Sequence, residues 1–311
     1  MPDKPQLSVI IASYNPGKLI ESCLESLRDQ KTDQPLEIIV VDSSTDGGSN
    51  LINETFPDVR LYQFSERKFC GDARNFGLSV AKGEIIAFID ADCRADRNWA
   101  NRILQAHQSS HLAIGGAIAN ANPQSAIGWA SYFCEFSQWM PGFPSRNMAD
   151  IAGANMSYKK RAFEEYGLFI AGTYSSDTEF HWRLEKNGQV LQFLPSILVF
   201  HHNIDRLGRF LRHEFEHGRS FARVRMKSRC FSKFRRWIYA TFSFLMPPWL
   251  FFKIGRNNLK NRTYLLHFLK AWPLLTLGLI AWSLGECGGY LFHSVDQALT
   301  QPNNPCLGRE D

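Results

Sequence analysis

Short apolar runs alternate with helical patterns over the first 120 residues, and this alternation constrains the fold more than any other feature of the chain. The apolar runs, rich in β-branched and aromatic residues, are Leu7–Ala12, Glu37–Asp42, Val59–Phe64, Glu84–Asp90 and Leu112–Ala119. The segments with helical spacing are Gly17–Gln30, Asp46–Thr55, Gly71–Lys82 and Asp96–Gln108. Strands that are apolar throughout and separated by helices predict an α/β fold, in which helices flank both faces of a mostly parallel sheet.

Polar side chains follow three of the predicted strands. Tyr14 and Asn15 follow the first strand, Asp42 closes the second, and Asp90 and Asp92 close the fourth. In sheets of this kind, ligands bind at the carboxyl ends of the strands. Carboxylates buried there are unfavourable unless they meet a cation or hydrogen-bond donors. The three clusters therefore predict one ligand site at one edge of the sheet.

Asp90 and Asp92 are separated by one residue, and the alternation of a strand would point both carboxylates the same way. Oxygen ligands suit Mg²⁺ or Mn²⁺, which usually share their coordination shell with substrate phosphates. A cation held there would neutralise the charge that builds up on a departing diphosphate. The pair therefore predicts a metal site for a substrate that contains a diphosphate.

The net charge of +5 originates in one segment of the chain. Residues 206–236 contain 11 Lys and Arg against 2 Asp and Glu, whereas residues 1–205 contain 18 against 24 and residues 237–311 contain 6 against 4. A basic stretch can bind nucleic acid or an anionic membrane surface. Because the most apolar part of the chain follows directly, we expect a membrane surface as the partner and no nucleic acid.

Two apolar stretches are present, Trp237–Gly255 and Leu265–Phe292. Within them, Ile238–Gly255 and Ala271–Phe292 are near the lower length limit for a membrane-spanning helix. If the first stretch spanned and the upstream basic segment were cytosolic, the positive connector 256–270 would lie outside, against the usual bias. Helices that lie in the membrane interface avoid this conflict, and a soluble apolar subdomain is the alternative. The seven cysteines form no CxxC pair, and no secretory signal precedes the first apolar run. We therefore expect reduced thiols and a membrane-associated protein with its catalytic domain in the cytoplasm.

Several segments, taken together and in order, resemble glycosyltransferase family 2, the inverting enzymes with the GT-A fold. The segments are LSVIIASYN at 7–15, EIIVVDSSTDGG at 37–48, GDARNFGLSVAKGEIIAFIDADC at 71–93, GANMSYKKRAFEEYG at 153–167, SDTEFHWRLEKNG at 176–188 and VFHHN at 199–203. Several independent motifs have to coincide for such a match, so the resemblance is specific. It implies a GT-A, Rossmann-like catalytic domain at 1–205.

The resemblance implies roles for individual residues. Those that would bind the nucleotide sugar are Ala12, Tyr14, Asp42, Arg74 and Asp90. Asp92 and His201 would bind Mn²⁺ or Mg²⁺, with His202 as a neighbouring candidate. Asp177 would be the general base that deprotonates the acceptor hydroxyl, so that the sugar is transferred in a single displacement with inversion.

The implied organisation has three parts. The catalytic domain consists of a nucleotide-sugar half at 1–120 and an acceptor half at 121–205, followed by a basic amphipathic helix at 206–236 and an apolar, membrane-associated helical region with a tail at 237–311. The expected donor is a nucleoside-diphosphate sugar, UDP-linked rather than GDP-linked, although the motif at Asp42–Asp46 is shorter than usual for the family. Ser176 replaces the usual Glu before the base. The expected acceptor is a glycan or a lipid-linked sugar.

Other interpretations remain open for several motifs. His213 to His217 reads His-Glu-Phe-Glu-His, the helix motif of zinc peptidases, although seven nearby arginines disfavour a dication there. A membrane-bound protein that binds sugar nucleotides without catalysis is a second alternative. Asp42 or Asp46 could serve as a helix cap, and Asn155 could be purely structural. We expect the aromatic residues between Trp129 and Trp139 to be packing residues.

Overall fold

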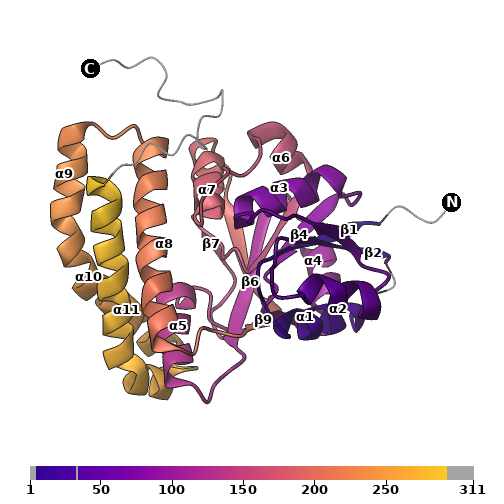
Figure 1. Cartoon of the computed structure of the whole chain (residues 1–311), viewed down its shortest axis with the longest axis horizontal. Coiled ribbons are helices and arrows are strands. Elements are labelled where there is room, and N and C mark those ends of the chain that lie inside the picture. The colour runs from indigo at the N-terminus through magenta and orange to yellow at the C-terminus, as the bar shows by residue number, and fades with distance from the viewer. Residues whose placement is uncertain (1–4, 33, 293–311) are drawn as a thin grey trace. The chain divides into compact units, whose positions relative to one another are not determined.

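The computed structural model describes residues 5–32 and 34–292, which divide into two compact units (Figure 1). The first unit comprises the chain up to Asn122 together with Trp139–Phe169 and Phe180–His202. The second unit comprises Pro123–Gln138, Ile170–Glu179 and the chain from Asn203 onward. The division therefore groups two pieces of the predicted acceptor half with the C-terminal helices.

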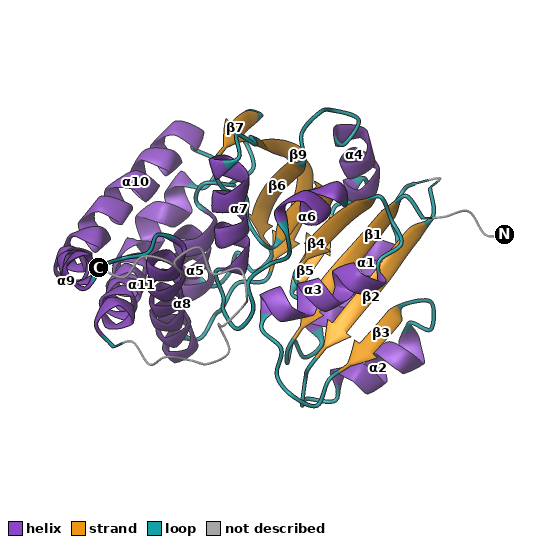
Figure 2. Cartoon of the chain, turned by 90° about the horizontal axis from the view of Figure 1, so that it is seen from above, coloured by secondary structure: helices purple, strands orange, loops and turns teal. Residues whose placement is uncertain are grey.

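Four parallel strands form one end of the sheet in the first unit, in the order β3-β2-β1-β4 (Figure 2). Their bounds are Leu7–Ser13 for β1, Leu36–Asp42 for β2, Arg60–Gln63 for β3 and Ile85–Ile89 for β4. Each strand agrees with a predicted apolar run to within about one residue. The predicted parallel arrangement is confirmed for this part of the sheet.

The sheet becomes mixed beyond β4. The remaining strands are β5 (Cys93–Ala95), β6 (Ala113–Asn120), β7 (Arg146–Met148), β8 (Asn155–Lys159) and β9 (Leu191–His201). Strand β8 is antiparallel to both β4 and β6, β9 is parallel to β6, and β5 and β7 are antiparallel to β9. Strand β9 is continuous, and its register with β6 shifts between Gly116 and Ala117. A mostly parallel sheet is thus too simple a description for this half.

Helices occupy the connections between the strands of the first unit. They are α1 (Leu19–Arg28), α2 (Gly48–Thr55), α3 (Cys70–Val80), α4 (Trp99–Ala106), α6 (Arg161–Tyr166) and α7 (Ser176–Lys186), of which α7 begins in the second unit. In α1 the buried side chains are Ile20, Cys23, Leu24 and Leu27, which is the spacing of an apolar face on a helix. The four predicted helices of the first 120 residues are therefore confirmed, with shorter ends.

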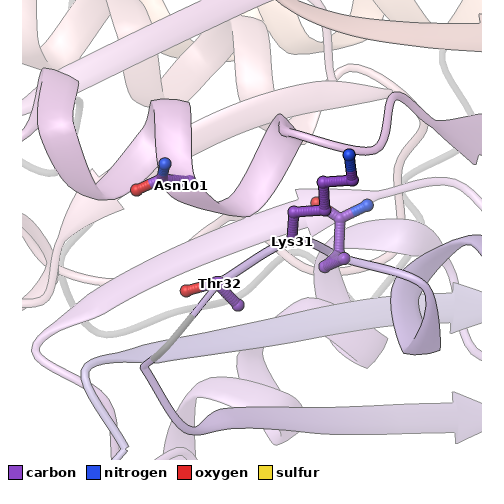
Figure 3. Close-up of a pocket in the computed structure, with 4 residues that line it drawn as sticks. Lys31, Thr32 and Asn101 are labelled. Carbon is purple, nitrogen blue, oxygen red and sulfur yellow. The ribbon is translucent and has the colours of Figure 1, made fainter.

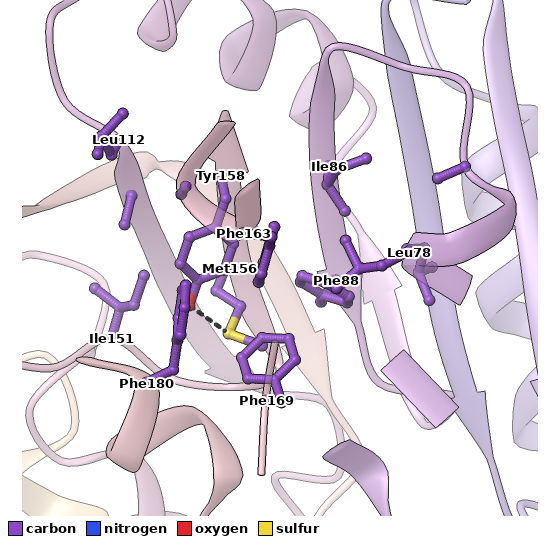
Figure 4. Close-up of a cluster of buried hydrophobic side chains, with 14 of the residues drawn as sticks. Leu78, Ile86, Phe88, Leu112, Ile151, Met156, Tyr158, Phe163, Phe169 and Phe180 are labelled. Atoms are coloured by element: carbon purple, nitrogen blue, oxygen red, sulfur yellow. Dashed lines mark hydrogen bonds between the residues drawn. The ribbon is translucent and has the colours of Figure 1, made fainter. Parts of the chain in front are cut away.

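An aromatic cluster forms the core beside β4 and β8 (Figure 4). Phe88 of β4 and Tyr158 of β8 pack edge to face, with ring centroids 6.0 Å apart. Phe169 and Phe180 pack edge to face with each other at 5.2 Å. The Tyr158 hydroxyl donates to the sulfur of Met156 at 3.1 Å, drawn as a dashed line in Figure 4. Rings in this geometry contribute about 0.5–1.5 kcal/mol per pair beyond their burial, so the cluster fixes strands from both parts of the sheet against the helices.

The second unit is helical. It contains α5 (Ala126–Phe136), α8 (Leu207–Ser228), α9 (Lys233–Phe242), the 3₁₀ turn η1 (Ser243–Leu245), α10 (Met246–Asn261) and α11 (Leu265–Leu291). Figure 1 shows α8 and α11 side by side. A Cβ atom added to Gly218 of α8 would overlap the carbonyl oxygen of Trp282, and one added to Gly285 of α11 would overlap that of Phe215. Glycines therefore allow the two helix backbones to approach closely.

The predicted apolar stretches form helices of different kinds. Trp237–Gly255 is divided among α9, η1 and α10, with Pro247 and Pro248 in the first turn of α10 where a missing N–H is tolerated. Leu265–Leu291 is a single helix, and among the described residues it alone is long and apolar enough to cross a membrane. The first stretch is therefore not a continuous helix of membrane-spanning length.

The described cysteines are mostly thiols. Among the described residues, Cys23, Cys93, Cys134 and Cys287 have free thiols. Cys230 is disulfide-bonded, and Cys306 lies outside the described residues. The expectation of reduced thiols is therefore wrong for Cys230.

Candidate active site

The carboxyl edge of the sheet collects polar residues from five strands of the first unit. Ser13 pairs with Asp42 across the ends of β1 and β2, and Ile89 at the end of β4 pairs with Asn155 at the start of antiparallel β8. Asn120 at the end of β6 pairs with His201 at the end of β9. Because β6 and β9 run in the same direction as β1 and β4, all these positions lie at one edge.

Asp42 is buried and held by hydroxyl groups. One carboxylate oxygen accepts from the Ser44 hydroxyl at 2.6 Å, and the other accepts from the Ser49 hydroxyl. The backbone near the start of α2 is instead bonded by Asp46, whose carboxylate accepts from the N–H groups of Gly48 and Gly17, each at 3.0 Å. Neither aspartate caps α2, because Gly47 occupies the N-cap position and no side chain accepts a capping hydrogen bond there.

The loops after β1 and β2 are joined through Asn15. Its backbone N–H donates to Ser44 Oγ at 2.7 Å, and its side-chain oxygen accepts from the Thr45 N–H at 2.7 Å. Tyr14, directly before it, is 43% exposed, and the Arg67 guanidinium lies 4.3 Å from the centre of its ring. A half-exposed ring stacked on a guanidinium provides flat surfaces of the kind that stack on a nucleobase.

Ala12 lies within β1 and pairs with Val41 of β2. It is partly buried against the core cluster, one residue before Ser13. The structure thus places Ala12 within β1, Tyr14 directly after β1, and Asp42 at the end of the adjacent strand β2.

Arg74 of α3 is buried and connects two segments of the edge. Its Nη2 donates to Asp90 Oδ1 at 3.2 Å and to the carbonyl of Gly153 at 3.1 Å. The side chain of Arg74 is 5% exposed and that of Asp90 is 33% exposed, so solvent screens the carboxylate more than the guanidinium. The ion pair neutralises both charges and fixes the direction of the Asp90 carboxylate.

Asp90 to Cys93 form a turn and do not continue β4. The Cys93 N–H donates to the Asp90 carbonyl at 3.0 Å, so the alternation of a strand does not govern the direction of the two carboxylates. Asp90 pairs with Arg74, whereas Asp92 lies beside His201. The Asp92 carbonyl also accepts from the N–H of His202 at 3.0 Å, which fixes this turn against the end of β9.

Asp92 and His201 have the chemistry of a divalent-cation site. Within the described residues, Asp92 Oδ1 is buried without a hydrogen-bond partner and lies 3.4 Å from Nε2 of His201. A buried carboxylate oxygen that lacks a donor is unfavourable, and a cation would satisfy it. The Cys93 thiol is the third group within reach. Carboxylate is the ligand type that suits Mn²⁺ and Mg²⁺, whereas a sulfur ligand suits softer metals, so Asp92 together with His201 could hold such a cation.

Asp177 lies at the start of α7, in the second unit. Its Oδ1 accepts from the Thr178 N–H at 2.9 Å. Burial lowers the pKa of His217 in α8, and the negative charges of Glu135 and Asp177 act in the opposite direction. Within the second unit, Asp177 is therefore close enough to His217 for their charges to interact.

The residues of the His-Glu-Phe-Glu-His motif lie in α8 and contact other residues of the helical second unit. Nε2 of His213 lies 3.4 Å from Oε1 of Glu135. Glu214 is buried, and burial together with the charge of Glu135 raises its pKa well above the usual value. A zinc peptidase needs this glutamate as a base in contact with water, and a fully buried carboxyl does not fit that role.

Two buried networks explain residues that the motifs left open or missed. Asn155 accepts from Trp99 Nε1 at 2.9 Å and donates to the carbonyls of Ala117 and Ile197 at 2.8 and 3.0 Å, which supports its structural interpretation. His181 of α7, which sequence reasoning missed, pairs through Nδ1 with Asp150. Its Nε2 lies 2.6 Å from the Tyr158 hydroxyl. These residues are far apart in sequence, so no local pattern could have revealed the second network.

Two further features are the aromatic segment after β6 and a hollow in the surface of the first unit. Trp129, Tyr132, Phe133, Phe136 and Trp139 are all buried, so the expected packing role is confirmed.

A polar hollow lined by Gln30, Lys31, Thr32 and Asn101 is shown in Figure 3. Cys23 of α1 contacts Asp90, whereas Gln30 follows the other end of α1, about two helical turns away. The hollow therefore does not belong to the edge that carries Asp90.

Comparisons with known proteins agree with this geometry. Residues 8–167 match the family described as glycosyl transferase family 2. Glycosyltransferase AglE of Haloferax volcanii is 26% identical over 235 residues, which cover 72% of this chain and 76% of that protein. The glucosyl-dolichyl phosphate glucuronosyltransferase of the same organism is 23% identical over 54% of this chain and 57% of its own length. The mannosyltransferase PcManGT from Pyrobaculum calidifontis, solved with GDP-Man and Mn²⁺, has a TM-score of 0.62 at 19% identity, covering 92% of this chain and 88% of that one, which shows a shared fold.

Proposed function

The chain belongs to glycosyltransferase family 2, and on that premise we propose that it moves a sugar from a nucleoside-diphosphate sugar to an acceptor hydroxyl with inversion. The observation that carries the proposal is the pair formed by Asp92 Oδ1, buried and without a hydrogen-bond partner, and His201 Nε2 at 3.4 Å. The pair lies at the same sheet edge as Asp42 and Asp90, where a nucleotide and its diphosphate would bind.

The nucleoside would bind at the ends of β1 and β2. Tyr14 and Arg67 offer flat surfaces for the base, and Ala12 lies on the adjoining strand. The carboxylate of Asp42, which now accepts from two hydroxyls, would accept from ribose hydroxyls in the same way. Arg74 would hold Asp90 at the diphosphate side of the nucleotide.

Asp92 and His201 would hold Mn²⁺ or Mg²⁺. When bound, the cation supplies positive charge that stabilises the departing nucleoside diphosphate. His201 has to be neutral to act as a ligand, and the backbone bond from His202 to the Asp92 carbonyl keeps the two ligands in register.

Asp177 is proposed as the general base on the strength of its place in the segment SDTEFHWRLEKNG. It would take the proton from the acceptor hydroxyl while the acceptor oxygen attacks the anomeric carbon. A positioned base of this kind contributes about 10²–10⁴-fold to the rate.

The acceptor is proposed to be a lipid-linked sugar or an envelope glycan reached at the cytoplasmic face of a membrane. One relative is named for glucosyl-dolichyl phosphate, a lipid-linked sugar. The long apolar helix α11 and the basic segment 206–236 are consistent with an anionic membrane surface as a partner.

A screen of nucleotide sugars tests the proposal. Purified protein is mixed with UDP- and GDP-linked sugars, with and without Mn²⁺, and both thermal stabilisation and release of the nucleoside diphosphate are measured. We expect a UDP-linked donor to stabilise the protein and to be slowly hydrolysed only when Mn²⁺ is present. The GDP arm is included because PcManGT was solved with GDP-Man. Stabilisation without any turnover, even with lipid-linked acceptors added, would favour the non-catalytic binding protein instead.

A further inference from the structure

Helices α9, α10 and α11 of the second unit expose many large apolar side chains. Among these are Phe234, Trp237, Trp249, Phe252, Leu266 and Leu269, each between 55% and 77% accessible. In the described part of the first unit, the exposed large hydrophobic side chains are Tyr14, Leu168 and Val190. A surface so rich in exposed apolar side chains marks an interaction site. We call it the outer face.

The two sides of α11 differ in their exposure to solvent. Phe268, Ala271 and Leu275 are buried, and they recur at the spacing of one side of a helix. Leu266, Leu277, Ile280 and Leu284 are exposed on the opposite side, each more than 40% accessible. The exposed stripe is thus apolar along nearly the whole length of a 27-residue helix.

The packing of α8 against α11 decides how α11 can meet a lipid bilayer. Gly218, Gly285 and Gly289 allow close contact along the two helices, and Arg225 pairs with Glu286 at 3.5 Å. The accompanying helix carries several further charged residues: Arg209, Arg212, Glu216, Arg219, Arg223 and Lys227. If α11 crossed a bilayer, it would take these charges into the hydrocarbon, where charged side chains are strongly disfavoured.

Basic residues lie among the apolar side chains of the outer face. Lys253, Arg256 and Lys260 belong to α10, within one turn or two of Trp249 and Phe252. The Lys253 ammonium lies 5.5 Å from the centre of the Trp249 ring. Helices that lie in the headgroup region of anionic membranes have this composition, with lysine and arginine beside tryptophan and phenylalanine.

We infer that the outer face docks flat on an anionic lipid bilayer, with α9, α10 and α11 lying in the plane of the interface and α8 on the aqueous side of α11. The inference specifies which surface would bind the membrane partner named in the proposed function, and the biological role of docking rests on that proposed function. Docking itself requires no sugar transfer.

The test uses the full-length chain and vesicles of phosphatidylcholine with or without phosphatidylglycerol. We expect binding to the anionic vesicles that weakens with added salt. The double variant Trp249→Gln with Phe252→Gln should lower the partition coefficient by about tenfold or more, because two apolar anchors are lost. Each of Lys253→Gln, Arg256→Gln and Lys260→Gln should lower it by about fivefold. The control, Leu168→Gln with Val190→Gln, removes equally exposed apolar side chains from the first unit and should leave binding unchanged.

The depth of α11 separates flat docking from spanning. Spin labels on cysteines introduced at Leu266, Leu277 and Leu284, corrected for labelling of the native cysteines, should all report a similar depth of about 5–10 Å below the headgroups. A depth that passes through a maximum at Leu277 would overturn the inference in favour of a spanning helix. Absence of vesicle binding would also overturn it, as would self-association in lipid-free buffer that the Trp249 and Phe252 variant abolishes.

Donor binding gives an independent readout. The outer-face variants should keep the Mn²⁺-dependent stabilisation by nucleotide sugars. If vesicles bind but no nucleotide sugar does, the proposed transferase activity fails and the docking inference stands. If nucleotide sugars bind but vesicles do not, the docking inference fails and the proposed transferase activity stands.

Discussion

Oδ1 of Asp92 is buried, has no hydrogen-bond partner and lies 3.4 Å from Nε2 of His201. The two atoms belong to segments more than 100 residues apart, which the turn after β4 and the end of β9 bring together. Without a cation the arrangement is unfavourable, since a buried carboxylate oxygen lacks the donor that it needs. If the proposed cation binds there, the arrangement lowers the stability of the metal-free protein and favours cation binding.

Replacing Asp92 with Asn should change both the stability of the metal-free protein and its response to the cation. Removing the charge should raise the melting temperature of the metal-free protein by about 2–4 °C, corresponding to about 1 kcal/mol. It should also abolish the further stabilisation by Mn²⁺ with a nucleotide sugar, as measured by differential scanning calorimetry. Asp58→Asn, which removes an exposed partner of Arg28, serves as the control and should change neither quantity appreciably. Unaltered metal-dependent stabilisation in Asp92→Asn would remove Asp92 from the proposed ligand set.

Replacing Asp177 with Asn should lower kcat by about 10²–10⁴-fold with little change in donor affinity, because the amide cannot accept the acceptor proton. Steady-state kinetics with a lipid-linked acceptor, together with calorimetric titration of the donor, measure the two effects separately. Asp205→Asn changes an exposed carboxylate of the second unit and should leave kcat unchanged. Wild-type turnover in the Asp177 variant would exclude it as the base.

Arg74 and Asp90 should be energetically coupled. A double-mutant cycle with Arg74→Met and Asp90→Asn, read out as the free energy of unfolding in urea, should give a coupling of about 1–2 kcal/mol, since the arginine is buried and the carboxylate partly screened. The same cycle on Arg28 and Asp58, with side chains 36% and 56% exposed, should give less than about 1 kcal/mol. Equal couplings would mean that burial of Arg74 adds nothing to the pair.

His107 should make the folded protein sensitive to acid. Burial lowers its pKa from 6.5 to about 3, with smaller contributions from the nearby charges of Lys159 and His111. Because the unfolded chain binds this proton more tightly, the stabilising contribution is complete above about pH 6.5 and is lost as the pH falls toward 3. At about 1.4 kcal/mol per pH unit, lowering the pH from about 7 to 5 should cost about 2 kcal/mol in this term.

The measurement is the free energy of unfolding as a function of pH. His107→Gln keeps a side-chain amide that can reach Ser157 and should flatten the slope between about pH 5 and 6.5. His111→Gln is the control and should retain the wild-type slope. A slope that is the same in all three proteins would show that other groups cause the acid sensitivity.

Gly218 should be intolerant of even a methyl group. A Cβ atom there would overlap the Trp282 carbonyl, which belongs to the backbone of α11 and cannot move aside cheaply. We expect Gly218→Ala to destabilise the protein by about 1–3 kcal/mol in urea unfolding. Gly208→Ala, in the first turn of the same helix, meets nothing within 4 Å and should be neutral or stabilising. Equal stability of the two variants would contradict the close packing of α8 and α11.

The sequence predicted those parts of the fold that depend on local pattern. The strands up to β4 and the helices between them follow from apolar periodicity, and Asp42 follows from its place at a strand end. The antiparallel insertion of β8 between β4 and β6 was not predictable, because the partners are about 70 and 40 residues away in sequence. The turn at Asp90 to Cys93 was missed for a local reason, since an apolar strand followed by alternating residues gives no sign of where pairing ends.

Residues whose role depends on tertiary contacts were the hardest to predict. Nothing near His181 in sequence indicates its pairing with Asp150 and Tyr158, which arises from the packing of α7 and β8. The separation of Ser243–Leu245 from the helices on either side was also hidden within a uniformly apolar stretch. The cap suggested for Asp46 was also wrong, because Gly47 occupies the N-cap position of α2 and Asp46 accepts from the Gly48 N–H without being the cap.

The pairing of Cys93 with His201 has a consequence for synthesis of the chain. Domains emerge from the ribosome in sequence order, and the parallel strands β1 to β4 can assemble once about the first 90 residues are free. The proposed cation ligands, however, come together only after the end of β9 has been made and paired with β5. Affinity for the proposed cation would therefore appear only when the first unit is complete. A nascent chain stalled before His201 would contain the proposed nucleoside-binding strands but would lack one of the two ligands for the cation that binds the diphosphate.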